Sequence, residues 1–239
     1  MTEQETLDTL ADLDLQVGQP KNGYRFSLDP LLLCDFAPLD RPAVLDLGSG
    51  CGIIPLIVAR RSAATRVVAV ELQPAMAELA ERNATRNGLS DRIEVLTADI
   101  TGLPGQLTAD SFDLVLANPP YRKAGSGRIS PTAGRDLARH ETTATLLDFL
   151  TVAKKMVKPG GSICFVHHAE RLAELLAGAL SLKLAPRRLQ LVHSDATKPA
   201  KLFLVELLKG RKEPLAILPP VFVKDSPYWT QQAGLRKGR

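Results

Sequence analysis

The stretch Val44-Leu45-Asp46-Leu47-Gly48-Ser49-Gly50-Cys51-Gly52 has the pattern of a buried strand that runs into a glycine-rich turn. Such a turn lets a ligand approach the backbone closely, since no Cβ atoms stand in the way. The glycines follow the spacing G-x-G-x-G and not the dinucleotide spacing G-x-G-x-x-G, and the lysine of a P-loop is absent. Asp46 would repel phosphates but suits an ammonium or sulfonium cation. The stretch therefore predicts a site for a nucleoside without a diphosphate, and S-adenosylmethionine carries both cations.

Outward from this turn, short apolar runs alternate with longer helical patterns, which is typical of a parallel sheet covered by helices. The expected strands are Ala43–Leu47, Val67–Val70, Ile93–Leu96, Phe112–Ala117 and Ser162–Val166. The expected helices are Ile53–Arg61, Pro74–Asn87, Thr142–Val157 and Arg171–Leu182. Two further runs, Leu189–His193 and Leu202–Leu207, have no helix between them and predict an antiparallel hairpin. The pattern predicts an α/β fold.

The chain has 239 residues with 45% hydrophobic content, enough for one large core, so a single domain is expected. Residues 1–42 should form an N-terminal strap, 43–208 the core, and 209–239 a basic, proline-punctuated tail of low order. Residues 158–161, Lys-Pro-Gly-Gly, should turn the chain into the next strand. No apolar run is long enough to span a bilayer, and the first residues lack the features of a signal peptide. We therefore expect a cytoplasmic protein without a membrane partner.

Cysteine, histidine and charge patterns limit the possible partners. Cys34, Cys51 and Cys164 form no Cys-x-x-Cys pair, and the four histidines lack metal-binding spacing, so buried thiols and no metal are expected. Residues 1–118 hold nine Lys/Arg and seventeen Asp/Glu, a net charge of −8. Residues 119–239 hold twenty-one Lys/Arg and nine Asp/Glu, a net charge of +12. The second half favours a polyanionic partner, although solvated helix faces would also explain its charge.

Acidic residues follow the two strands after the glycine turn. Glu71, ahead of Leu72, could accept hydrogen bonds from the vicinal hydroxyls of a ribose. Asp99, ahead of Ile100, could reach an adenine amino group. Helix capping is the alternative explanation for each acid. With Asp46, these acids indicate one ligand site at the carboxyl ends of parallel strands.

The tetrapeptide Asn118-Pro119-Pro120-Tyr121 directly follows the fourth expected strand. The prolines stop the strand and leave carbonyl groups without neighbouring N–H donors. The Asn118 side-chain oxygen and the Pro119 carbonyl could then accept both protons of one NH₂ group, which directs its lone pair toward a methyl donor. Tyr121 would stack on a planar substrate group. The motif predicts methylation of an amino nitrogen, and a simple proline-rich turn is the alternative.

Residues Gln19 to Leu208 resemble the class I methyltransferases, and the resemblance implies a Rossmann-like fold with a mostly parallel seven-stranded sheet and an antiparallel C-terminal hairpin. The segment 19–33, with Asn118–Tyr121 and Ala138–Glu141, narrows the resemblance to bacterial enzymes that methylate N6 of the adenine 3′ of the anticodon in a valine tRNA. It implies that Tyr24, Arg25 and Phe26 lie over the cofactor. The full set of expected cofactor-binding residues is Tyr24, Arg25, Phe26, Asp46, Gly48, Gly50, Gly52, Glu71, Leu72, Asp99, Ile100 and Asn118.

The basic residues indicate an RNA substrate in which one adenine is splayed out. The expected RNA contacts are Arg122, Lys123, Arg128, Arg135, Arg139, His140, Arg187, Arg188, Lys198 and Lys201. Methylation of release-factor glutamine is the main enzymatic alternative, but about forty residues before the glycine turn are too few for a substrate-binding domain. DNA methylation and a non-catalytic, cofactor-binding RNA-binding protein are further alternatives. We expect tRNA as partner and a monomer or weak dimer.

Overall fold

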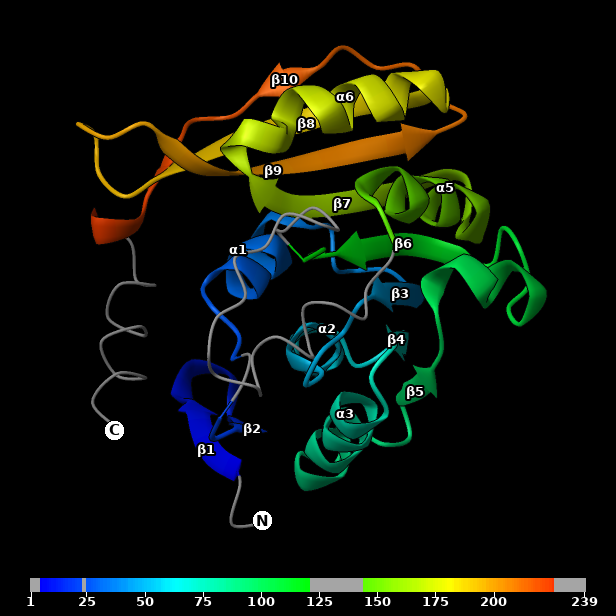
Figure 1. Ribbon diagram of the computed structural model, residues 1–239, viewed down its shortest axis with the longest axis vertical. Helices are drawn as coiled ribbons and strands as arrows, with labels where there is room; N and C mark the ends of the chain where they lie inside the picture. The colour runs from blue at the N-terminus through cyan, green and yellow to red at the C-terminus, as the bar shows by residue number, and fades with distance from the viewer. Residues whose placement is uncertain (1–4, 23–24, 121–143, 226–239) are drawn as a thin grey trace.

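The computed structural model describes residues 5–22, 25–120 and 144–225, which build a central nine-stranded sheet and a separate two-stranded hairpin (Figure 1). The order in the sheet is β10-β8-β9-β7-β6-β3-β4-β5, and β11 also pairs with β8. The strands are β3 (Ala43–Leu47), β4 (Arg66–Glu71), β5 (Ile93–Thr97), β6 (Phe112–Ala117), β7 (Val157–His168), β8 (Leu184–His193), β9 (Ala200–Lys209), β10 (Ala216–Ile217) and β11 (Val221–Phe222). Strands β3 to β7 are mutually parallel, and β9 is antiparallel to both neighbours. The α/β prediction and the C-terminal hairpin are confirmed.

Helices cover both faces of the sheet, because the strands are apolar on both sides. Val44 and Leu114 belong to one core, which includes α1 (Asp29–Phe36), α2 (Ile53–Arg61) and α3 (Pro74–Arg86). The next residues along the same strands, Leu45 and Val115, belong to a second core with α5 (Leu146–Met156) and α6 (Leu172–Ser181). Short 3₁₀ turns follow some strands: η1 (Ala11–Leu13), η2 (Ile100–Gly105), η3 (Ala169–Arg171) and η4 (Val223–Asp225). The result is a three-layer α/β/α architecture.

The helix ends follow the punctuation in the sequence. α3 begins at Pro74, because a proline in the first turn removes an N–H that has no partner within the helix. It ends before Asn87-Gly88, and Gly88 takes the left-handed φ of +65° that favours glycine. At the start of α5, Thr145 and Asp148 form a capping box. These local signals explain why the predicted and observed bounds nearly coincide.

Residues 5–20 of the N-terminal strap form a β hairpin of β1 (Glu5–Leu10) and β2 (Leu15–Pro20), which pair antiparallel, and α1 belongs to the same strap. Figure 1 shows the hairpin beside α3 and apart from the central sheet. Leu10, Leu15 and Val17 are buried in the same core as α2 and α3. The strap therefore packs on the helical layer that supports the glycine turn.

We expect low order for the basic tail, but the tail forms regular secondary structure as far as residue 225. β10 and β11 run parallel to β8, and the Leu218 N–H donates to the Leu189 carbonyl at 2.8 Å. The tail thus adds two short strands to the seven expected ones, because the edge of β8 offers unpaired backbone groups. Residues 158–161 also differ, since they lie inside β7 and not in a turn before it, with a register shift against β6 between Phe112 and Leu114. Within the described residues, no helix is long and apolar enough to cross a membrane.

Candidate active site

The carboxyl ends of β6, β3, β4 and β5 meet, in that order, at one edge of the sheet. The strand register sets Leu47, the last residue of β3, beside Ala117 of β6 and Val70 of β4. Ligands bind at such edges in open α/β sheets, because the connecting loops diverge there. This edge carries, from β6 to β5, Asn118, the glycine loop of residues 48–52, Glu71 and Asp99.

The glycine loop takes a conformation that other residues rarely adopt. Gly48, Gly50 and Gly52 have φ of +77°, +56° and +83°. The N–H groups of Gly48 and Ser49 both donate to the Val70 carbonyl at 2.9 Å, which ties the loop to the neighbouring strand. A Cβ at Gly52 would lie 3.0 Å from the Ala80 Cβ of α3, so the loop lies directly on that helix. The G-x-G-x-G spacing is thus required by backbone geometry and by packing.

Asp46 is the main unsatisfied polar group at this edge. Its side chain is completely buried on β3, and neither carboxylate oxygen has a hydrogen-bond partner among the described residues. Burial is the main reason that the pKa of the Asp46 carboxyl is raised to about 7; the nearby Ser49 hydroxyl lowers the pKa, and the Glu71 carboxylate makes a smaller contribution that raises it. A cation would satisfy this group, since a buried carboxylate needs a partner. The ammonium and sulfonium groups of S-adenosylmethionine fit this requirement.

Glu71 and Asp99 already hold backbone N–H groups. Glu71 accepts from Gly50 N at 2.8 Å and from Gln73 N at 2.9 Å, so it fixes the glycine loop as well as facing the ligand edge. Asp99 accepts from the N–H of Thr101 at 2.9 Å and from its hydroxyl at 2.8 Å, which caps η2. Capping therefore does occur at Asp99. Contacts of these acids with ribose and adenine stay predictions, as do those of half-buried Leu72 and buried Ile100.

The strap residues near the ligand edge contact one another. Arg25 forms an ion pair with Asp8 at 2.7 Å and also donates to Thr6. The Phe26 N–H donates to the buried side chain of Gln19 at 2.9 Å, and the Phe26 ring packs against the core. Arg25 is thus paired with the strap itself, and its contact with a cofactor carboxylate stays a prediction. Tyr24 lies outside the described residues.

The acceptor motif follows β6 without a gap. Asn118 is half-buried, Pro119 is buried and Pro120 is exposed. Ala117 and Leu47 are register partners on neighbouring strands, so the residues that follow them, Asn118 and the first residue of the glycine loop, lie side by side. Tyr121 lies outside the described residues, as do the expected RNA contacts Arg122, Lys123, Arg128, Arg135, Arg139 and His140.

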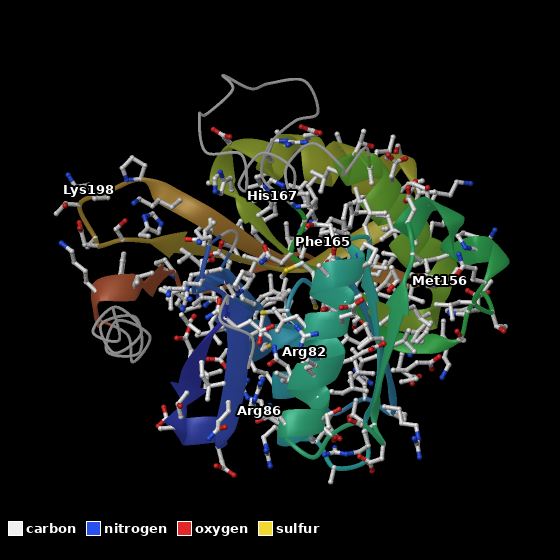
Figure 2. All side chains as sticks on the ribbon, turned by 60° about the horizontal axis from the view of Figure 1, so that its bottom comes forward. Arg82, Arg86, Met156, Phe165, His167 and Lys198 are labelled. Carbon is white, nitrogen blue, oxygen red and sulfur yellow. The ribbon has the colours of Figure 1, made fainter. Side chains whose placement is uncertain are left out.

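Four of the expected RNA contacts lie within the described residues, and they divide into two groups. Lys198 lies in the turn between β8 and β9, at the tip that Figure 2 shows, and Lys201 near the start of β9 is exposed. Arg188 lies further back on β8, where it pairs with the fully buried Glu206 and donates to the Phe36 carbonyl at 3.0 Å. Arg187 reaches the same carboxylate at 3.2 Å. Both arginines thus hold a buried carboxylate, and RNA contacts of all four residues stay predictions.

The sequence analysis did not identify two buried polar residues, Asn83 and His167. Asn83 on α3 is completely buried and hydrogen-bonds to the glycine loop and to the strap. The sequence signal for it is an asparagine four and three residues after the apolar Leu79 and Ala80, which places it on the buried face of the helix. His167 at the end of β7 is also buried, and burial, with the charge of Arg171, lowers its pKa to about 4, so the imidazole is neutral at pH 7.

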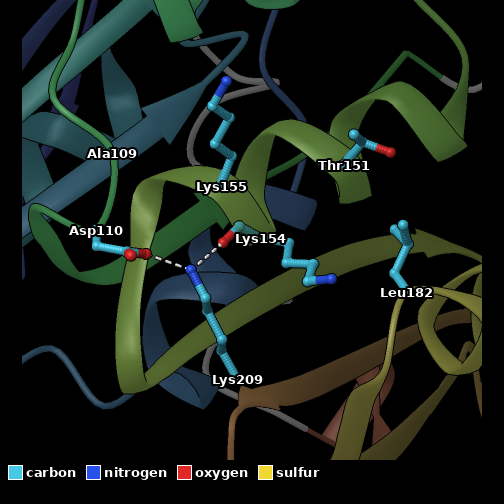
Figure 3. Close-up of a pocket in the computed structure, with 7 residues that line it drawn as sticks. All are labelled: Ala109, Asp110, Thr151, Lys154, Lys155, Leu182 and Lys209. Carbon is cyan, nitrogen blue, oxygen red and sulfur yellow. Dashed lines mark hydrogen bonds and ion pairs between the residues drawn. The ribbon is translucent and has the colours of Figure 1, made fainter.

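A separate hollow of about 340 Å³ lies at the other end of the sheet (Figure 3). Lys209 Nζ donates to the carbonyl oxygens of Lys154 at 2.7 Å and Val157 at 2.9 Å, and it pairs with Asp110. These contacts satisfy the carbonyl end of α5. The hollow is lined by Ala109, Asp110, Thr151, Lys154, Lys155, Leu182 and Lys209, and none of these follows the carboxyl end of a parallel strand.

All three cysteines are free and buried, as expected. Burial raises the pKa of the Cys51 thiol to about 12, and it raises those of Cys34 and Cys164 too. These thiols stay protonated at neutral pH and are poor nucleophiles. Among the described residues, no group of three or more His, Cys, Asp or Glu side chains could hold a metal ion.

Residues 29–184 match the family model described as methyltransferase small domain. A tRNA1(Val) (adenine(37)-N6)-methyltransferase from Porphyromonas gingivalis is 34% identical over 164 residues, which are 68% of this chain. The match spans 64% of that protein, which is less than two thirds of its length. A protein of the same name from Pectobacterium carotovorum is 31% identical over 199 residues, 82% of this chain and 79% of that one. The structure of a predicted O-methyltransferase from Agrobacterium tumefaciens is 25% identical with a TM-score of 0.68, and the match covers 86% of this chain and 96% of that chain. These matches confirm the class I methyltransferase fold.

Proposed function

The chain belongs to the methyltransferase small domain family and to that of the tRNA1(Val) (adenine(37)-N6)-methyltransferases, and on this premise we propose that it methylates the exocyclic N6 of an adenine in tRNA. The observation that carries the proposal is the position of Asn118. It follows β6 directly beside the glycine loop, so an amino acceptor and a methyl donor would meet at one edge. The proposed location of the protein in the cell is the cytoplasm, and the proposed partner is tRNA.

S-adenosylmethionine, when bound, supplies an activated methyl group on a sulfonium. The glycine loop, Asp46 and Glu71 would hold it, with Leu72, Asp99 and Ile100 at the adenosine end. Asp46 would stabilise the cationic part, because its carboxylate is buried without another partner among the described residues. The fixed loop geometry means that little has to be reorganised on binding.

Asn118 and Pro119 would orient the acceptor nitrogen. The Asn118 side-chain oxygen and the Pro119 carbonyl would accept the two protons of the amine, which leaves its lone pair directed at the donor. An amine becomes acidic only after it is methylated, so no strong base is needed beforehand. Positioning and exclusion of water then account for most of the rate acceleration.

Exposed lysines near the same edge support a nucleic acid substrate. Lys198 and Lys201 lie on the β8–β9 hairpin, whose tip points in the direction in which the parallel strands end. Their charge would contact phosphates and position the RNA without reading its bases. The net charge of +12 in residues 119–239 agrees with this proposal.

The proposal is tested by transfer of labelled methyl groups to total tRNA, total protein and DNA from a strain that lacks the gene. We expect label in tRNA alone. Label in protein would favour glutamine methylation and refute the tRNA proposal, and label in DNA would refute it too. No label in any of the three would favour the non-catalytic RNA-binding alternative.

The Asn118→Ala variant separates acceptor positioning from cofactor binding. We expect it to lose transfer while the Kd for S-adenosylhomocysteine stays within about twofold of the original, since its role is to orient the amine. The Kd is measured by calorimetry. Equal losses of transfer and of cofactor affinity would show that Asn118 is structural.

A further inference from the structure

The side chain of Asn83 has all of its hydrogen-bonding capacity in use. Its Nδ2 donates to the carbonyl oxygens of Gly18 and Cys51, both at 2.9 Å. Its Oδ1 accepts from the Gly18 N–H at 2.8 Å and from Arg86 Nη1 at 2.6 Å. An amide side chain donates two protons and has two acceptor positions, so the match is complete. The opposite amide orientation would set an oxygen against two carbonyls.

Asn83 therefore joins two segments that are far apart in the sequence. Gly18 belongs to the strap, and Cys51 lies in the glycine loop between Gly50 and Gly52. A Cβ at Gly18 would come within 3.0 Å of Asn83 Oδ1, so only glycine allows this approach without a shift. Figure 2 shows Arg86 between α3 and the strap hairpin. Arg86 donates to Asn83 Oδ1, so the contacts of Asn83 lie next to it.

The Cys51 carbonyl belongs to the peptide that leads into Gly52, where φ is +83°. Asn83 fixes the orientation of this peptide from the side of α3. Glu71 fixes the loop from the side of β4, through its bond to Gly50 N. Besides the backbone bonds to Val70, the loop is thus held by one side-chain donor and one side-chain acceptor, both buried. A loop fixed in advance loses less entropy when it binds a ligand.

We propose that Asn83 is a positioning residue for cofactor binding, which acts by holding the Cys51 carbonyl and so the shape of the glycine loop. The proposal rests on the proposed use of this loop for S-adenosylmethionine. It predicts that Asn83 contributes to cofactor affinity beyond its contribution to stability, because a distorted loop must be reordered on binding.

Asn87 provides a matched control one helical turn further along. Its side chain accepts from Gln16 N at 2.9 Å and donates to the Gln16 carbonyl at 2.8 Å. It therefore ties the same strand, β2, to the same side of α3, and the described structure gives it no hydrogen bond to the glycine loop. A role that depends only on docking the strap would be shared by Asn83 and Asn87.

The experiment compares the Kd for S-adenosylhomocysteine of the full chain with those of Asn83→Ala, Asn83→Asp and Asn87→Ala, alongside urea denaturation of each. Asn83→Asp keeps the acceptor for Gly18 N and Arg86 but loses the donor to the carbonyl oxygens of Gly18 and Cys51. We expect both Asn83 variants to raise the Kd about tenfold, the equivalent of about 1.4 kcal/mol. Asn87→Ala should stay within about twofold although it also loses stability.

An unchanged Kd in the Asn83 variants, or an equal rise in Asn87→Ala, would overturn the proposal. An unmodified protein that binds no S-adenosylhomocysteine would instead overturn the proposed function. A second measurement needs no substitution and covers the case of an Asn83 variant that fails to fold. In the unmodified protein, the Nδ2 protons of Asn83 should become more protected from exchange by NMR when S-adenosylhomocysteine binds, and those of Asn87 should not. Equal protection of both side chains would refute the positioning role.

Discussion

Replacing Asp46 by asparagine should change how the stability of the cofactor-free protein depends on pH. The carboxyl is completely buried, its oxygens lack partners among the described residues, and its pKa rises from 3.8 to about 7. The folded protein thus holds this proton more tightly than the unfolded chain does. Its contribution to stability is complete below pH 4 and is lost as the pH rises through 7.

The magnitude follows from the two pKa values of Asp46, 3.8 in the unfolded chain and about 7 in the folded one. Between pH 5 and pH 8, proton linkage at this one group lowers the free energy of unfolding by about 2–3 kcal/mol. Asparagine has nearly the same shape and does not titrate. The difference between the original protein and Asp46→Asn therefore isolates this contribution from all other titrating groups.

Urea denaturation of both proteins at pH 5, 6, 7 and 8 measures this difference directly. The original protein should lose stability relative to Asp46→Asn as the pH rises. Saturating S-adenosylhomocysteine should reduce the loss, because a cation beside Asp46 favours the carboxylate. Parallel pH profiles of the two proteins would refute the assignment of a buried, protonated carboxyl at this position.

Three further substitutions test the site and its support. Gly52→Ala should cost about 1–3 kcal/mol in urea denaturation and weaken S-adenosylhomocysteine binding, since φ is +83° and a Cβ would lie 3.0 Å from a side chain of α3; unchanged stability would contradict the loop geometry. Arg188→Ala should lower the free energy of unfolding by about 3 kcal/mol, because Glu206 is buried and would lose a charged partner; a decrease below about 1 kcal/mol would show that the pair is dispensable. The double variant Lys198→Ala, Lys201→Ala should weaken tRNA binding, measured by filter binding. The slope of the logarithm of the binding constant against the logarithm of the salt concentration should fall by about one for each phosphate that these lysines neutralise. An unchanged slope would exclude both lysines from the RNA surface.

The sequence by itself determined the fold class and the positions of most elements. Apolar runs such as Phe112–Ala117 are buried on both faces, as expected for strands of a parallel sheet that is covered by helices. The G-x-G-x-G spacing likewise indicated the ligand loop, because left-handed φ values restrict those positions to glycine. These features are local, so they can be recognised along the chain without knowledge of distant contacts.

Only the tertiary structure decided which polar groups are paired within the fold. Arg188 has the same charge as Lys198, but it pairs with a buried Glu206 that lies 18 residues further along the chain. Asn83 makes contacts 65 and 32 residues away, and no local pattern specifies such partners. The tail after Lys209 joins the sheet because β8 has an open edge, which exists only once the sheet has formed. Long-range hydrogen bonds and ion pairs depend on which segments meet, and for this protein that information lies in the packing of its layers.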